Sequence, residues 1–251
     1  MSRSKYKNLI IVGNGFDCWQ NIPTSYEEFR LYYAEHIDAV ATELGYSFYT
    51  IDDKSGNKKK ITSVELIYGN PLAPDNLESE FFWNLEARLD KLDDQLINLY
   101  FGREDEGRKA LNKAVDEAVN LLRRLFCDWV STFNIEPMDS GFHFSEDCFV
   151  INFNYTDTIE KRFGLSADQV FHIHGSANDA DSILVGHATH PEEPFRELAE
   201  RNFIKSLDPS KGLPRIDGLY AIEQALYKTD KHTIDNIDRL CVAFMERNVH
   251  V

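Results

Sequence analysis

The sequence has few cysteines and no long apolar segment. Its four cysteines are widely spaced and form no Cys-x-x-Cys pair, so we expect neither a structural zinc module nor a disulfide framework. No apolar run approaches the roughly 20 residues that span a bilayer. The apolar residues Leu9 to Val12, which follow a basic N-terminus, are too few for a signal-peptide core. These absences predict a cytoplasmic protein without a membrane segment.

Positive charge is also scarce. The chain carries 27 Lys and Arg against 42 Asp and Glu, which gives a formal net charge of −15. Such a field repels a phosphate backbone, so nucleic acid is not expected as a partner. The one dense basic cluster, Lys58 to Lys60, follows Gly56 and Asn57 and is interpreted as a solvated turn.

The length and the hydrophobic fraction of 43% suit a globular chain. We expect a single α/β domain over residues 1–251 with a helical insertion at 75–133. Within that insertion, apolar residues recur with a helical period over 75–100 and 104–133. Other expected elements are a helix from Thr24 to Gly45 with a Thr24–Glu27 capping box, an irregular or hairpin segment at 46–74, a short helix capped by Asp157, and helices at 192–207, 216–229 and 233–247.

Short apolar runs mark the expected strands. They begin at Leu9, Cys148, Val170 and Ile183. Because the first run, Leu9 to Val12, shows no polar alternation, we expect it to be buried on both faces, as in a parallel sheet. The sequence therefore predicts a Rossmann-like parallel sheet flanked by helices.

Each of these strands ends in small or polar residues. In an open parallel sheet, ligands bind beyond the carboxyl ends of the strands. Together the endings predict a nucleotide-binding site. The four endings are Gly13-Asn14-Gly15-Phe16-Asp17, Asn152-Phe153-Asn154-Tyr155-Thr156, His172-Ile173-His174-Gly175 and Gly186-His187.

The first ending suits a phosphate. Gly13 and Gly15 let backbone N–H groups approach the charge closely, although Cys18 stands where a Gly-x-Gly-x-x-Gly motif has its third glycine. Asp17 has two readings, a hydrogen bond to a ligand ribose or a cap for the next helical turn.

The other endings supply amides and imidazoles. If the strand persists, Asn152 and Asn154 point to the same side and can bond a ribose or an amide; the alternative is local Asx hydrogen bonding. His172 and His174 should likewise share a face. His174, next to Gly175, is the candidate general base.

The histidines also allow a metal-dependent reading. His187 and His190 could join His172 and His174 around an ion, as in a phosphohydrolase. Because no carboxylate stands at a familiar ligand spacing, no metal site is predicted.

Several ordered motifs resemble the AbiH-like family of bacterial phage abortive-infection proteins. They are Leu9 to Asp17, Ile22-Pro23-Thr24-Ser25-Tyr26 with Phe29, Glu80 to Glu86, Phe153 to Glu160, and Ile173-His174-Gly175. The resemblance covers most of the chain and implies antiviral defence in bacteria. It also implies that relatives continue into a further strand, which Val249 to Val251 would begin.

The same layout distantly resembles the sirtuin-type NAD-binding fold. That resemblance implies NAD or a related nucleotide as ligand, with Asn154 orienting the ribose or a water and His174 acting as general base. The contacts that it and the strand endings imply are Gly13, Asn14, Gly15, Phe16, Asp17, Asn152, Thr156, Gly175 and His187. Asn14 and Thr156 depart from the sirtuin pattern and the Cys-rich zinc module is missing, which disfavours deacetylation.

Two functions follow from these resemblances. The first is a defence enzyme that cleaves NAD. The second is a non-enzymatic sensor with a vestigial pocket, in which the insertion 75–133 binds a phage or host protein.

Overall fold

The structure is a computed structural model that describes residues 5–52, 56–68, 105–137, 141–179, 182–184, 233–247 and 249. It divides into two compact units, one made of residues 1–29, 126–184 and 231–251, the other of residues 30–125 and 185–230. The helices expected at 75–100, 192–207 and 216–229 lie outside the described residues, as do His187 and His190.

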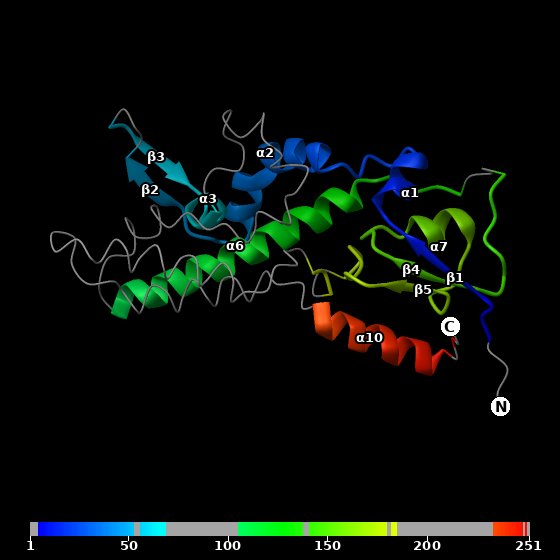
Figure 1. The fold of residues 1–251 in the computed structure, drawn as a ribbon. Helices are drawn as coiled ribbons and strands as arrows, with labels where there is room; N and C mark the ends of the chain where they lie inside the picture. The colour runs from blue at the N-terminus through cyan, green and yellow to red at the C-terminus, as the bar shows by residue number, and fades with distance from the viewer. Residues whose placement is uncertain are drawn as a thin grey trace, which may run out of the picture. The chain divides into compact units, whose positions relative to one another are not determined.

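A parallel sheet forms the centre of the first unit (Figure 1). Its strands are β1 (Asn8–Val12), β4 (Cys148–Asn152) and β5 (Val170–His172), in the order β1-β4-β5. Val12 is paired with Asn152, and Asn152 with His172, so the three strands end level with one another. The expected α/β fold with a parallel sheet is confirmed at this level.

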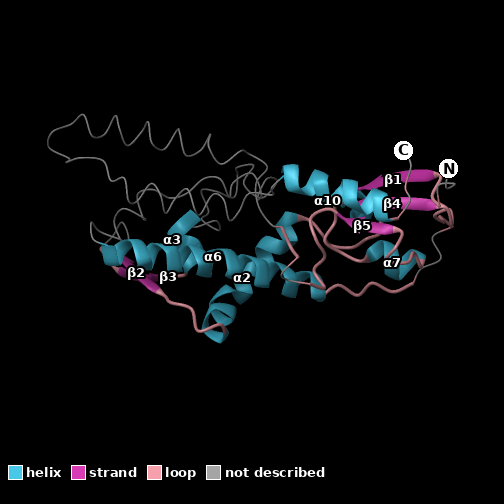
Figure 2. Ribbon diagram, turned by 90° about the horizontal axis from the view of Figure 1, so that it is seen from below, coloured by secondary structure: helices cyan, strands magenta, loops and turns pink. Residues whose placement is uncertain are grey.

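Helices cover both faces of this sheet. Side chains of Val12, Val150 and Val170 pack with Ile159 of α7 (Thr158–Phe163) on one face. On the other face, α10 (Thr233–Glu246) packs Leu240 and Phe244 against the sheet, on a cluster formed by Tyr6, Phe149, Ile151 and Val249. Figure 1 shows α7 above and α10 below the strands, and Figure 2 views the same sheet from the side of α10. All five residues of β4 are buried, as expected for a central strand covered twice.

The prediction that Leu9 to Val12 is buried on both faces is wrong. Leu9 is 39% and Ile11 is 66% exposed, whereas Val12 is buried. Within the described part of the chain, β4 is the one strand that pairs with β1. Next to β1 there is otherwise a single parallel bridge, between Tyr6 and Val249. Strand β1 therefore lies at the edge of the sheet, where one of its faces stays uncovered. The apolar sequence of Leu9 to Val12 does not reveal this edge position.

The other described elements are helices and one antiparallel strand pair, and the short helices at 14–19 and 63–68 were not predicted. They are α1 (Asn14–Trp19), α2 (Tyr26–Glu43), the antiparallel pair β2 (Tyr49–Asp52) and β3 (Lys58–Ile61), α3 (Ser63–Tyr68) and α6 (Asp105–Ser131). The hairpin and the helices α6 and α10 confirm predictions. None of the described helices has a segment long and apolar enough to cross a lipid bilayer.

Two helix starts differ from the expected ones. Ser25 Oγ, not Thr24, accepts a hydrogen bond from the Glu28 N–H at the start of α2. At α3, Thr62 and Glu65 form a reciprocal capping box, with Glu65 Oε2 3.0 Å from the Thr62 nitrogen and Thr62 Oγ1 3.4 Å from the Glu65 nitrogen. This box converts a segment expected to be extended into a helix.

Candidate functional site

The loop after β1 exposes bare backbone. Gly13 precedes α1 in an extended conformation, with φ −128°, and its carbonyl accepts a hydrogen bond from the Phe16 N–H at 2.9 Å. Gly13, Asn14 and Gly15 are exposed. A Cβ built at Gly13 or Gly15 would find no heavy atom within 4 Å. The local fold therefore needs glycine at neither position, and the backbone there stays accessible to a ligand.

Asn154 ties the end of β4 to this loop. Its Nδ2 donates to the Gly13 carbonyl oxygen at 3.1 Å, and its side chain is almost fully buried. Asn152 is turned inward, where Oδ1 accepts from the Asn154 N–H at 2.9 Å and Nδ2 donates to the Thr156 carbonyl at 3.3 Å. The alternative reading of Asn152 as a local Asx group is the one that the structure supports. Because β4 ends at Asn152, the strand alternation that would put the two amides on one side does not extend to Asn154.

Asp17 lies behind the loop, not on its surface. It is fully buried, and Oδ2 accepts a hydrogen bond from Thr156 Oγ1 at 2.5 Å. Burial raises the pKa of Asp17, although hydrogen bonds from Thr156 and Thr158 and the charges of Arg162 and His172 oppose the rise. Asp17 thus links α1 to the segment after β4, and α1 has no side-chain cap.

Strand β5 ends at His172, and the chain turns before it reaches His174. His172 Nε2 lies 2.7 Å from Glu160 Oε1, and Nδ1 lies 3.1 Å from the Asn154 carbonyl oxygen. The His174 ring instead lies edge-on to Phe153, with centroids 5.4 Å apart. The strand alternation on which the expectation of a shared face rests therefore stops at His172.

Gly175 has a structural reason to be glycine. Its φ is +79°, and a Cβ there would lie 2.0 Å from the Ser182 carbonyl oxygen. The neighbouring chain is held by a hydrogen bond from the Leu184 N–H to the His174 carbonyl at 3.0 Å and by Tyr155 Oη, which donates to the Leu184 carbonyl at 3.0 Å. Segment 182–184 therefore packs directly on the turn that carries His174.

This arrangement brings Gly13, Asn154 and the residues after β5 to one edge of the sheet. A family model described as Bacteriophage abortive infection AbiH matches residues 9–250 of the sequence. The chain belongs to this AbiH family. Membership indicates a role in bacteriophage abortive infection. No curated protein and no solved structure gives a significant match.

The sequence analysis did not identify two charged residues of the candidate site. Glu160 pairs with His172, and Arg162 Nη1 donates to the carbonyl oxygen of Gln20 and to its Oε1. Both lie on α7, directly after the β4 ending. Their position in the sequence could have indicated them, because they lie on the helix that directly follows a polar strand end. The first turn of such a helix can place side chains next to the end of the sheet.

The metal-dependent reading of the AbiH chain has no support from the part that the structure describes. Its His, Cys, Asp and Glu side chains there form no group of three or more that could hold an ion. His187 and His190, which that reading requires, lie outside the described residues.

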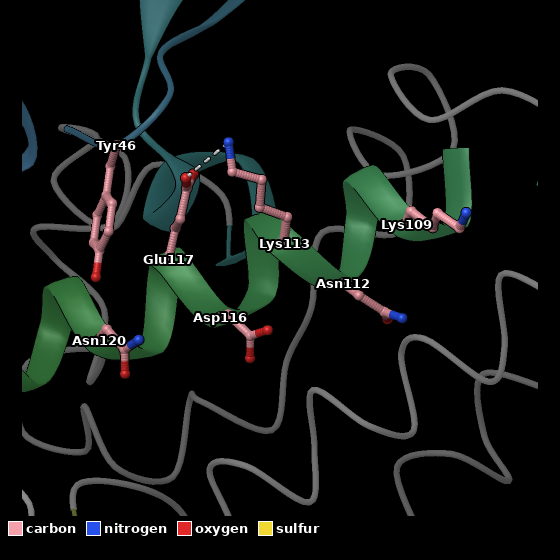
Figure 3. A pocket seen from close by; sticks show the side chains of 7 residues that line it. All are labelled: Tyr46, Lys109, Asn112, Lys113, Asp116, Glu117 and Asn120. Atoms are coloured by element: carbon pink, nitrogen blue, oxygen red, sulfur yellow. Dashed lines mark ion pairs between the residues drawn. The ribbon is translucent and has the colours of Figure 1, made fainter. Parts of the chain in front are cut away.

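The other unit contains a polar pocket of about 490 Å³ (Figure 3). Its residues come from α6, apart from Tyr46, and none of them is a predicted site residue; they are Tyr46, Lys109, Asn112, Lys113, Asp116, Glu117 and Asn120. Buried Glu117 accepts from Tyr49 Oη and from the Ser47 N–H, each at 3.4 Å, and pairs with Lys113. Glu117 is thus used to join α6 to the segment after α2.

The surroundings of His172 favour its protonated form. A carboxylate and a carbonyl face its two ring nitrogens, and only the imidazolium donates from both. Burial works against the charged form, but the hydrogen bond and charge of Glu160, together with the Asn154 carbonyl, outweigh it and raise the pKa of His172.

The contribution of His172 to stability should therefore fall as the pH rises. The folded-state pKa lies above the unfolded one of about 6.5, so the contribution is complete below about pH 6.5 and is lost as the pH passes the folded value. Urea denaturation of the protein and of His172→Gln from about pH 5.5 to about pH 8.5 measures it. The difference in free energy of unfolding should shrink with rising pH, and Glu160→Gln should remove the pH-dependent part. A difference that does not change with pH would contradict the imidazolium.

Proposed function

We propose that this AbiH protein binds a nucleotide at the carboxyl ends of β1, β4 and β5 and cleaves NAD there as a defence output. The observation that carries the proposal is the hydrogen bond from Asn154 Nδ2 to the Gly13 carbonyl, which fastens the end of β4 to an exposed glycine loop. Parallel strands that end level, with helices on both faces, support a Rossmann-like pocket of sirtuin type at this edge.

The residues present fit a phosphorylated ligand. The open space at Gly13 and Gly15 lets an anion reach backbone N–H groups without a side chain in the way. Behind the loop, the guanidinium of Arg162 supplies a positive charge, whereas the charge of a protonated His172 is offset by the paired Glu160 carboxylate. Asn14 and Phe16 flank the ligand in this proposal, while Asp17, Asn152 and Thr156 hold the loops from behind.

His174 is the proposed general base. It removes a proton from a water molecule whose oxygen forms a bond to C1′ of the ribose. The bond between C1′ and the nicotinamide nitrogen breaks, and its electron pair neutralises the pyridinium. The products are nicotinamide, ADP-ribose and a proton. Asn154 acts by holding the Gly13 loop in place, and the partly exposed Phe153, 5.4 Å from the His174 ring, restricts the imidazole.

Replacing Gly15 with alanine should separate stability from binding. Gly15 is helical and has open space at its Cβ position, so the Gly15→Ala variant should gain about 0.4–1 kcal/mol in unfolding free energy. The added methyl group would stand where the ligand approaches the backbone and should weaken NAD binding about tenfold. Urea denaturation and calorimetric titration measure the two effects. Unchanged binding in the stabilised variant would remove Gly15 from the pocket.

The function itself is tested by incubating the purified protein with NAD and following nicotinamide release. Turnover supports the enzyme. Binding of NAD or ADP-ribose without turnover would leave a nucleotide sensor, and the absence of binding by either would overturn the pocket.

A further inference from the structure

An aromatic cluster lies beside the glycine loop. It combines Phe16 and Trp19 of α1 with Phe142 and Phe144, which precede β4, and Phe163 at the end of α7. The Trp19 ring lies 5.6 Å from Phe16 and 5.8 Å from Phe142 in edge-on geometry, and Phe16 lies 5.5 Å from Phe163. Phe16 and Phe144 also pack on the core under the sheet. The cluster is therefore anchored from beneath.

The outer ring of this cluster is open to solvent. Trp19 is 56% exposed and Phe142 is 39% exposed. An indole that two neighbouring rings hold in place while more than half of its area stays exposed loses little conformational freedom when a flat group stacks on it. A purely structural tryptophan would be expected to bury more of its area.

Helix geometry places this indole next to the exposed backbone. Gly15, Cys18 and Trp19 have i, i+3 and i+4 spacing, so they share one face of α1, and both Gly15 and Cys18 are exposed. Helical side chains lean toward the N-terminus, which directs the indole over the turn that contains Gly15 and Phe16. Its contact with Phe16 agrees with that direction. The seven residues from Gly13 to Trp19 span six helical rises, roughly 9 Å, which is comparable with the length of a nucleoside phosphate.

We propose that Trp19 is the base-stacking subsite for a nucleotide whose phosphate lies at Gly13 to Gly15. This inference rests on the proposed nucleotide function. It adds that Trp19 contacts the base of the nucleotide. The ligand class is a nucleotide with an aromatic base, and the subsite accepts the base by its face. Stacking tolerates different bases because every base has a π-face, so adenine and guanine nucleotides should bind with similar affinity.

The test compares ADP with ribose 5-phosphate on the full chain and on two variants. Trp19→Ala should weaken ADP binding about 10- to 100-fold and leave ribose 5-phosphate binding unchanged, because only ADP has a base to stack. Trp19→Phe keeps an aromatic face and should retain ADP affinity within about threefold. ADP should also quench tryptophan emission in the unmodified protein but not in Trp19→Phe.

The outcomes separate the two proposals. ADP affinity that is unchanged in Trp19→Ala, or a loss shared equally by ribose 5-phosphate, would overturn the stacking role and leave the nucleotide function standing. Failure of the unmodified protein to bind either compound would overturn the nucleotide function and the stacking role together. If Trp19→Ala does not fold, Trp19→Phe and the quenching measurement decide.

Discussion

Gly175→Ala is expected to lower the free energy of unfolding by about 2–5 kcal/mol. An L side chain at φ +79° costs about 1–2 kcal/mol. The new Cβ would also lie 2.0 Å from the carbonyl oxygen and 2.5 Å from the carbonyl carbon of Ser182, so backbone must move. Such overpacking costs about 1–3 kcal/mol. A loss of this size is a large part of the stability of a typical domain.

Two other glycines make a graded control. Gly164 has φ +70° but no neighbour within 4 Å of a Cβ, so Gly164→Ala should cost only about 1–2 kcal/mol. Gly13 has φ −128° and open space, and Gly13→Ala should change stability by less than about 0.5 kcal/mol. Urea denaturation of all three variants gives the comparison. Equal losses at Gly164 and Gly175 would show that the approach of Ser182 carries no energetic weight.

His174→Ala is expected to reduce NAD cleavage by about 10²- to 10⁴-fold, the usual contribution of a positioned general base. The half-buried ring lies beside Phe153 and Tyr155 in the turn after β5 and belongs to neither core cluster of the sheet, so its loss should leave the fold intact. Nicotinamide release at saturating NAD measures the effect on kcat. Retained binding of ADP-ribose would show that the pocket itself survives.

A matched histidine provides the control for His174. His36 stacks on Tyr32 at 4.0 Å within α2, away from the strand ends in sequence, and His36→Ala should keep full turnover. Wild-type turnover in His174→Ala would eliminate the imidazole as base. Loss of turnover in both variants would point to a general effect on folding.

The sequence predicted the sheet better than the site. Strand β4 was recognisable because a fully buried strand is a continuous apolar run, and α6 and α10 were recognisable from long helical periodicity. The tight contact between Asn154 and Gly13 follows from strands that end level. The register of the parallel pairing makes the strands end level. The sequence does not reveal this register, but in any parallel sheet the carboxyl ends of the strands lie at one edge, so the approach of the strand endings to one another could be predicted.

The side-chain roles depended on where each strand stopped. The sequence could not show that β5 ends at His172, because the backbone hydrogen bonds of the turn decide it, including Gly175 N–H to the His172 carbonyl at 3.3 Å. That end removes the strand alternation that would have related His174 to His172. The charge on His172 in turn needs Glu160, 12 residues away on another element, and no spacing rule pairs a strand residue with it.

The uncovered face of β1 bears on how the protein behaves when it is concentrated. Leu9 and Ile11 project from a strand whose outer ladder, within the described residues, is bridged only at Tyr6. Unpaired strand edges with apolar side chains are templates for intermolecular pairing. Self-association in crowded solution should therefore begin at this strand, and the strand ends that carry the candidate pocket would then lie beside the contact between molecules.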